Sequence, residues 1–478
     1  MRGRIARHLG AIAALSTATR GAPLAAAAMA TKATPDDLPA EFSWHDYAVF
    51  LLSVAAEIEH SLMVQYLYAA YSLGGPQVPV EHRKAALEWQ RIILGIAKEE
   101  MGHLVTVQNV IKLIGGALHL DREDYPWISG FYPYAFTLEP LSQKSLAKYV
   151  VAESPETWPE DVSSAERQTI EDLAREDAEQ DVARVGALYQ RIREILSDRD
   201  KIPDAMFHPE TYPFQASWDE WGRGYAAGAR GSTSKTAPDV LVLCASSRTE
   251  AVAALAAVAE QGEAVTFIAA DREDSHFSRF LEVYRGFSKI ASEVGVLPLA
   301  KDPRAPGIDA GASGAVIEHP KARLWAALFN LRYRMLLSYL AHAYRLSDDP
   351  AQTMGPGRRG QVINRIFGEM YHLKSIAGLL VQLPLKDDPG ERAGPPFQMP
   401  YTLSFPAAEP DFWQLHLDLL AAACAQLTTI CREMSGPGRA YAESLQRADR
   451  QTIVEIETIL YAAPAGVSRQ PRSMGSVR

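Results

Sequence analysis

An acidic pair and a histidine interrupt an apolar segment in the sequence EEMGH (Glu99–His103). The surrounding stretch, Trp89–Gly116, has the apolar spacing of a helix that packs into a core. At about 100° per residue, Glu100 falls in the middle of the apolar stripe and His103 lies one turn on, at its shoulder, whereas Glu99 points further round. We therefore predict that Glu100 and His103 face the core as an i, i+3 pair, and that Glu99 is a solvated acid or supports the pair from behind.

The preceding helical segment, Trp44–Leu73, directs one more acid at the core. Glu59 lies within the apolar stripe of this segment, whereas Glu57 and His60 point to its other side. A buried, unpaired carboxylate is costly, so it is normally paired, protonated or bound to a metal. Glu59 and the pair on the next helix therefore form either a buried ion-pair network or half of the di-metal carboxylate site of four-helix bundles. Carboxylate and imidazole ligands suit iron or manganese, and without a metal the same groups are a candidate acid–base couple.

The other half of such a site requires ligands from later helices. The stretch Ala257–Tyr284 supplies Glu263 and His276, and we expect a break near Gly262 to let these two side chains converge. A third helix is predicted over residues 164–197, but its most apolar part, VGALYQRI, contains no acid. We interpret the acids of its polar first half as a surface face: Glu171, Glu176 and Glu179.

The second half of the chain repeats part of this pattern. The segments beginning at Ser61 and Glu99 resemble those beginning at Arg334 and Gly368, at offsets of 273 and 269 residues, so the second half is either a diverged copy of the first helix pair or a chance likeness of amphipathic helices. In this second half, Glu369 and His372 repeat the Glu-x-x-His spacing, while Arg332 takes the place of Glu59. The pattern favours a buried Arg332–Glu369 ion pair over a second metal site.

Helical periodicity dominates the chain, which predicts an all-α fold. Two helices, a long crossover rich in Gly, Pro and aromatic residues, and further helices are typical of a four-helix bundle with one long crossover. VLVLCA (Val240–Ala245) is the one predicted strand. We expect an extension over residues 1–35, a bundle over 40–300 and a C-terminal helical domain over 318–465. The predicted helices are Trp44–Leu73, His82–Ile114, Ser164–Ser197, Arg248–Glu260, Ser275–Val294, Lys321–Leu346, Gly357–Leu383, Asp411–Met434 and Arg439–Tyr461.

The composition bounds the partners of this 478-residue chain. With 47% hydrophobic and 22% charged residues it is an ordinary globular protein, and the net charge of −10 argues against nucleic acid held through its phosphates. Three scattered cysteines are too few for a disulfide framework or a thiolate metal site. The sequence contains no long uncharged apolar run, so we predict no membrane-spanning helix. We expect a cytoplasmic protein that can form a homo-oligomer. The basic, alanine-rich residues 1–35 are also compatible with a leader.

Four segments together resemble the ferritin-like proteins of the iminophenyl-pyruvate dimer synthase and chromopyrrolate synthase type. The resemblance covers roughly Ser43–Leu460, and the segments are AAEIEHSLMVQYLYAAYSL, EEMGHLVTVQNVIKLIGG, EQGEA with SHFSRF, and PPFQMPYTLSFP. It implies a ferritin-like bundle with a metal site and a place in bacterial secondary metabolism. The metal ligands that it implies are Glu59, Glu100, His103, Glu263 and His276. The third-helix carboxylate common in di-iron bundles is not evident, so one or two ions are compatible with the sequence.

The resemblance also implies an activity. The expected protein is an oxidoreductase with a non-haem iron centre, manganese being the other metal, that uses dioxygen or peroxide on a small imine derived from an amino acid or on an aromatic molecule. Glu100 and His103 are the predicted catalytic residues, and Tyr66, on the stripe of Glu59, is the aromatic residue of greatest interest. The alternative is a non-catalytic, metal-binding or partner-binding scaffold, which the missing third-helix acid favours.

Overall fold

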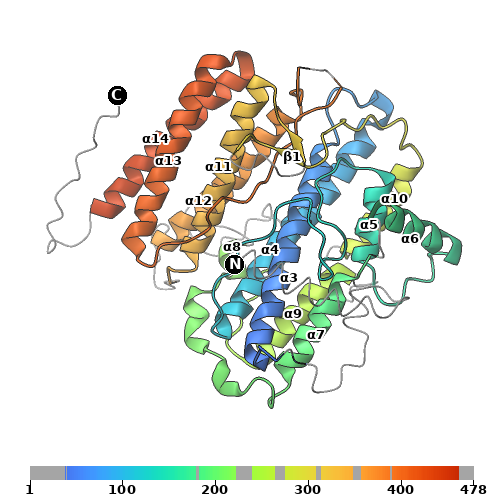
Figure 1. Ribbon diagram of the computed structural model, residues 1–478, viewed down its shortest axis with the longest axis vertical. Helices are drawn as coiled ribbons and strands as arrows, with labels where there is room; N and C mark the ends of the chain where they lie inside the picture. Colours follow the sequence, from blue (N-terminus) through green and yellow to red (C-terminus); the bar gives the residue numbers. More distant parts are fainter. Residues whose placement is uncertain are drawn as a thin grey trace. The chain divides into compact units, whose positions relative to one another are not determined.

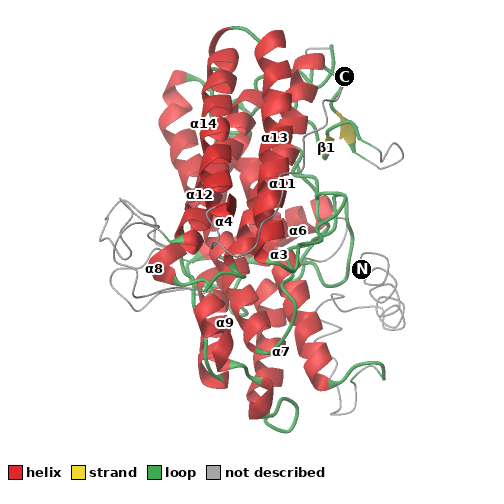
Figure 2. Ribbon diagram, turned by 90° about the vertical axis from the view of Figure 1, so that its left-hand side faces the viewer, coloured by secondary structure: helices red, strands yellow, loops and turns green. Residues whose placement is uncertain are grey.

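The structure is a computed structural model that describes residues 38, 40–178, 182–221, 240–263, 275–307, 314–347, 357–387 and 390–461. The chain divides into two compact units, Met1–Leu403 and Ser404–Arg478. Figure 2 shows that helices make up almost all of the described secondary structure, as predicted. The extension predicted over residues 1–35 lies outside the described residues.

The fold rests on a long helix pair, α3 (Trp44–Tyr71) and α4 (Arg83–Leu113). Ser43 begins α3 through a capping box, because its hydroxyl accepts a hydrogen bond from the amide of Asp46 at 3.1 Å. Gly115, with a φ of +78°, ends α4 in the left-handed conformation that glycine adopts without strain. The helix α3 is long and apolar enough to cross a membrane, but 72% of its most apolar window is buried, as expected for a core helix.

Two further helices complete a bundle with this pair: α7 (Val185–Ser197), which packs on α3, and α9 (Arg248–Glu263), which packs on α4 and α7 (Figure 1). The single helix predicted over residues 164–197 is wrong in this respect, because the chain forms α6 (Ser164–Ala178) and α7 separately. The polar α6 packs on α5, whereas the amphipathic α7 packs on α3 and α9, and one straight helix cannot reach both places.

The crossover between α4 and α7 contains a helix that the sequence did not predict, α5 (Gln143–Ala152), which packs against α10 (His276–Ser288). Most of α5 is buried, including Ser145, Leu146 and Tyr149. This helix and α10 cover one side of the bundle (Figure 1). The crossover is therefore part of the core and not a surface connection.

The first unit also contains the helix pair α11 (Pro320–Ala343) and α12 (Arg358–Leu380). The predicted ion pair between Arg332 and Glu369 is confirmed, with 3.0 Å between Nη1 and Oε1 and both side chains buried. The second unit holds α13 (Glu409–Glu433) and α14 (Gly436–Tyr461). Residues 318–465, predicted as one helical domain, are thus divided between the two units.

The strand prediction is wrong. Val240–Ala245 forms no strand, and its backbone is instead bonded to side chains, including Thr106 and Asn109 of α4. The described strands are two short parallel ones, β1 (Pro303–Arg304) and β2 (Ala315–Val316). The remaining short elements are η1 (Val80–His82), η2 (Asp204–Met206), η3 (Pro209–Phe214) and α8 (Trp218–Trp221).

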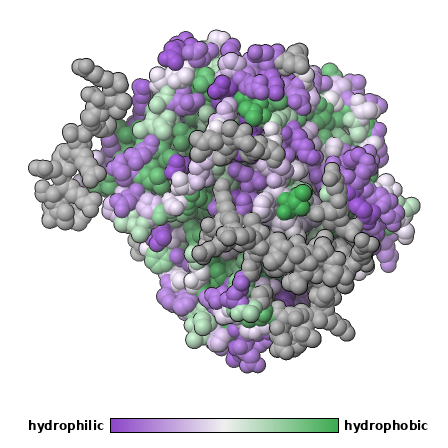
Figure 3. Space-filling view, viewed as in Figure 1, coloured by the Kyte–Doolittle hydropathy of each residue, from purple (hydrophilic) through white to green (hydrophobic). Residues whose placement is uncertain are grey.

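Charged side chains lie on both sides of α3 inside the protein. Glu57 accepts a hydrogen bond from His119 at 2.8 Å, and His60 is hydrogen-bonded to Tyr333, so the face opposite Glu59 is buried too. On the described part of the surface seen in Figure 3, hydrophilic residues predominate and hydrophobic ones form small groups. The charged side chains of α3 named here therefore lie inside the protein and not on its surface.

Candidate metal centre

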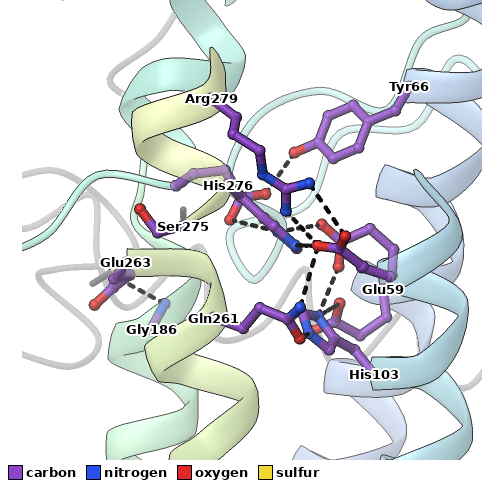
Figure 4. Close-up of polar contacts among 12 residues, drawn as sticks. Glu59, Tyr66, His103, Gly186, Gln261, Glu263, Ser275, His276 and Arg279 are labelled. Carbon is purple, nitrogen blue, oxygen red and sulfur yellow. Dashed lines mark hydrogen bonds and ion pairs between the residues drawn. The ribbon is translucent and has the colours of Figure 1, made fainter. Parts of the chain in front are cut away.

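Four of the five predicted ligands meet between α3, α4 and α10 (Figure 4). Glu59 comes from α3, Glu100 and His103 from successive turns of α4, and His276 from the first residue of α10. All four residues are almost completely buried. Glu100, His103 and His276 each present a ligand atom within 4.8 Å of the others, which is a possible metal-binding group.

Glu100 lies between the two histidines. Its Oε2 is 2.8 Å from Nδ1 of His103, and its Oε1 is 3.0 Å from Nδ1 of His276. Oε2 of Glu59 lies 3.4 Å from the same Nδ1 of His103. Nδ1 of each histidine therefore faces its own oxygen of the Glu100 carboxylate.

The outer nitrogen of each ring has a partner of its own. Nε2 of His103 is 3.0 Å from Oε1 of Gln261, and Nε2 of His276 is 2.9 Å from Oε2 of Glu99. With these oxygens as acceptors, the hydrogen of a neutral ring is on Nε2 and the lone pair of Nδ1 is directed inward. The rings are thus oriented as ligating histidines usually are, with an acceptor behind each one.

Glu153 is a member of the cluster that the sequence analysis missed. It follows directly after α5, and its Oε2 is 3.7 Å from Nδ1 of His276. Its Oε1 accepts a hydrogen bond from the hydroxyl of Tyr66 at 2.6 Å. Gly262 makes room for it, since a Cβ there would lie 3.0 Å from Oε2 of Glu153. The signal in the sequence was an acid at the end of an apolar helical turn inside the crossover.

The bundle helix α7 contributes a phenol and not a carboxylate. The hydroxyl of Tyr189 donates a hydrogen bond to Oε1 of Glu59. Burial and the nearby carboxylate of Glu59 raise the pKa of Tyr189, so the phenol keeps its proton and remains a donor. The expectation that this stretch offers no acidic ligand agrees with the structure, and Tyr189 takes the position in contact with Glu59.

Glu263 is the predicted ligand that the structure does not bring to the cluster. Its Oε1 accepts a hydrogen bond from the amide of Gly186 at 3.0 Å, and in Figure 4 it points away from His103 and His276. A Cβ at residue 186 would overlap this carboxylate, so the glycine leaves room for Glu263 in its present position. Because α9 continues to Glu263, residues 261 and 263 differ by about 200° around the helix, and Gln261 is the one that faces the centre. Burial raises the pKa of Glu263 to about 7.

Glu99 is buried, contrary to the prediction of a solvated acid. Arg279 of α10 pairs with it, with 3.1 Å between Nη1 and Oε1 and a shorter contact from Nη2 to Oε2. Burial alone would raise the pKa of Glu99, but hydrogen bonds and charges from His276 and Arg279 lower it to about 2. Glu99 therefore supports the cluster from behind, which was the other expectation for it.

Carboxylates outnumber permanently charged basic groups in the cluster. Four carboxylates, of Glu59, Glu99, Glu100 and Glu153, face one permanently charged group, the guanidinium of Arg279. Without a metal, protons offset this excess of negative charge: burial together with the charge of Glu100 raises the pKa of Glu59 to about 8. Burial alone would lower the pKa of His103, but the carboxylates of Glu100 and Glu59 raise it to about 10.

Two ligand atoms in the middle of the cluster face each other at 3.0 Å but are poorly aligned for a hydrogen bond. Oε1 of Glu100 and Nδ1 of His276 are buried and have no well-directed hydrogen bond within the described part of the chain. The cluster has an excess of buried carboxylates, poorly hydrogen-bonded ligand atoms, and both oxygen and nitrogen ligands. These properties fit a divalent iron or manganese ion. The residues present therefore fit the metal that the fold implies.

Comparison with known proteins agrees with this geometry. Residues 52–285 match the Ferritin-like family. This part of the chain is therefore similar to ferritin-like domains. The matched residues include α3 from Leu52 onward, all of α4, α7 and α9, and every residue of the cluster just described.

Two curated bacterial proteins are similar to the chain over most of its length. It is 28% identical over 380 residues (72% of this chain) to dichlorochromopyrrolate synthase of Lentzea aerocolonigenes. It is 26% identical over 414 residues (79% of this chain) to 2-imino-3-(indol-3-yl)propanoate dimerase of Chromobacterium violaceum. The chain spans 35% and 36% of the length of these relatives. No solved structure matches it significantly.

Proposed function

We propose that this protein is a metal-dependent oxidoreductase with a non-haem iron centre, acting on a small imine derived from an amino acid, or on a related aromatic molecule, in secondary metabolism. The observation that carries the proposal is the position of Glu100, which directs one oxygen at His103 and the other at His276. A carboxylate that faces two histidines in this way would allow Glu100, His103 and His276 to hold one or two metal ions together, as in carboxylate-rich helix bundles.

The cluster has two halves that are built alike. The His103 half consists of Glu59, Oε2 of Glu100 and His103, and the His276 half consists of Glu153, Oε1 of Glu100 and His276. In each half a tyrosine donates to the carboxylate that is not shared. When bound, iron supplies open coordination positions for dioxygen or peroxide.

The residues around the centre exclude water and fix the ligands. The ring of Tyr66 packs at 4.8 Å, between ring centroids, from both Tyr149 and Phe280, and all three side chains are buried. Tyr66 and Tyr189 hold Glu153 and Glu59 in place through their hydroxyl groups. A dry, pre-ordered set of carboxylates favours reactions whose intermediates must not meet water.

The substrate class rests on the relatives. One is named for the dimerisation of an indolyl imino acid and the other for the synthesis of a chlorinated chromopyrrolate. Both names point to oxidative or coupling chemistry on molecules derived from aromatic amino acids. We extend only the general class to this chain, which covers about a third of each relative.

A non-catalytic scaffold is the alternative, supported by the lack of an acid in the third helix and by the degenerate second copy, in which Arg332 takes the place of Glu59. Glu153 provides the carboxylate that α7 does not, so this absence no longer favours the scaffold. Self-association and a cytoplasmic location remain predictions from the sequence.

The test begins with protein purified without added metal and with its iron and manganese measured. The protein is then loaded with ferrous iron without oxygen, exposed to air, and followed by absorbance and oxygen consumption with a 2-imino acid formed from an aromatic L-amino acid. Iron binding, an absorbance change and substrate-dependent oxygen uptake are expected, all lost in Glu100→Gln and retained in Glu57→Gln, a buried glutamate on the other face of α3. Absence of metal binding would refute the centre, and metal without oxygen chemistry would leave only the scaffold.

A further inference from the structure

The two halves of the centre differ in what lies behind the histidines. Behind His276 is the carboxylate of Glu99, at 2.9 Å from Nε2, and behind His103 is the neutral amide oxygen of Gln261, at 3.0 Å from Nε2. The distances are almost equal, so the difference between the halves is chemical and not geometric.

The two halves share the same kinds of ligand and the same tyrosine support. Each has one carboxylate of its own that accepts from a buried tyrosine, and both use Glu100. The rings themselves are nearly parallel, with centroids 5.2 Å apart and 26° between their planes. The acceptor behind the ring is therefore the feature that separates the halves.

A carboxylate behind a ligating imidazole makes the ring a stronger donor than an amide does, because the negative charge stabilises the Nε2–H and moves electron density toward the metal-binding nitrogen. Loss of such a partner typically weakens metal binding about 10–100-fold. Arg279 keeps Glu99 in this role by holding both of its oxygens.

The two acceptors also belong to one network. Nε2 of the Gln261 amide donates to Oε2 of Glu99 at 3.1 Å, which turns the oxygen of Gln261 toward His103. The order Arg279, Glu99, Gln261 fixes the amide in the orientation that accepts from His103. The hydrogen-bond network thus fixes which acceptor lies behind each histidine, a carboxylate behind His276 and an amide oxygen behind His103.

We infer that the centre has two unequal metal positions: the His276 half takes the first ion tightly, and the His103 half holds a second, more weakly bound and exchangeable ion. Glu99 and Gln261 set this difference. The inference rests on the proposed metal centre and adds which position fills first and which residues decide it.

The test is a titration of the metal-free protein with cobalt(II), followed by its visible absorbance and by calorimetry. Two steps are expected, with affinities at least about tenfold apart. Glu59→Gln should remove the weaker step and keep the tighter one, whereas Glu153→Gln should do the reverse. These two variants change matched, tyrosine-bonded carboxylates, so each serves as the control for the other.

The second part of the test addresses the acceptors. Glu99→Gln should weaken the tighter step about 10–100-fold and leave the weaker one nearly unchanged, and Gln261→Leu should affect the weaker step alone. A single cobalt per chain, two equal steps, or loss of the tighter step in Glu59→Gln would overturn the inference while leaving a metal centre in place. No cobalt binding by the unmodified protein would instead refute the proposed function itself.

Discussion

Two helix pairs of this protein carry a Glu-x-x-His sequence at corresponding places, and their surroundings differ at one decisive position. In α3 and α4, Glu59 lies opposite Glu100 and His103, and the group has an excess of negative charge. In α11 and α12, the residue opposite Glu369 is Arg332, and the charges balance within the protein.

The difference shows what a metal-binding cluster requires beyond its motif. The guanidinium of Arg332 occupies the place of a cation and removes the electrostatic demand for one. His372 is also less enclosed, with 28% of its side chain exposed against 3% for His103. The spacing alone is therefore compatible with either a ligand set or a structural ion pair, and the facing helix decides between them.

The largest effect is expected from Glu59→Arg, which gives the first pair the charges of the second. Its guanidinium should pair with Glu100 as Arg332 does with Glu369, and iron bound per chain should fall below about a tenth of the unmodified level. Metal analysis after iron loading measures this. The isosteric Glu59→Gln, expected to lose the weaker ion and keep the tighter one, guards against misfolding of the arginine variant. Full iron in both variants would contradict the role of Glu59.

The next effect concerns the second pair. Arg332→Met leaves Glu369 buried without its cation and should lower the free energy of unfolding by about 3–5 kcal/mol. The double variant Arg332→Met with Glu369→Met should recover most of this loss, since no lone charge remains. Urea unfolding gives both values. A double variant as unstable as the single one would show that packing, and not charge, is responsible.

The two pairs should differ in how their stability depends on pH on the alkaline side in the metal-free protein. The raised pKa of Glu59, about 8, and of His103, about 10, mean that the folded state binds more protons, so stability falls as pH rises from about 4.5 to 10. Arg332 lowers the pKa of Glu369 although burial alone would raise it, so the second pair loses stability as pH falls below about 4.5.

The measurement is the unfolding midpoint in urea against pH, with and without a saturating metal. Glu59→Gln and added metal should each flatten the alkaline decline, and Glu369→Gln should reduce the loss on the acid side. An alkaline decline of equal size with metal bound would contradict the view that protons replace cations in the first cluster.

The sequence was sufficient for those parts of the site that depend on one helix. The angular positions of Glu59, Glu100 and His103 follow from regular helices with well-marked ends, and the structure has all three buried together. Glu153 lies just past a helix of the crossover, and its position depends on how α5 packs against α10, which no local pattern encodes. Tyr189 likewise contacts Glu59 only because the third helix is divided into α6 and α7.

The boundary of one helix explains the remaining difference. We predicted that α9 ends at Glu260, which left the directions of residues 261 and 263 undetermined, and the helix in fact runs to Glu263. Glu99 was expected at the surface because its own helix places it off the apolar stripe, but α10 covers that side and brings Arg279. A helix end thus decided the first case, and a tertiary contact decided the second.

The smallest effect is expected from Glu263→Gln, which tests whether the centre has the composition seen here. An amide oxygen can still accept from Gly186, and the residue lies away from both histidines, so metal content and affinity should not change. Because burial raises the pKa of Glu263 to about 7, the unmodified carboxylate disfavours folding increasingly between about pH 4.5 and 7, and the variant should be more stable by about 1 kcal/mol above pH 7. Metal analysis and urea unfolding at pH 6 and 8 measure the two effects. Loss of metal in Glu263→Gln but not in Glu153→Gln would restore Glu263 as the ligand and remove Glu153, and with it the matched second half of the centre.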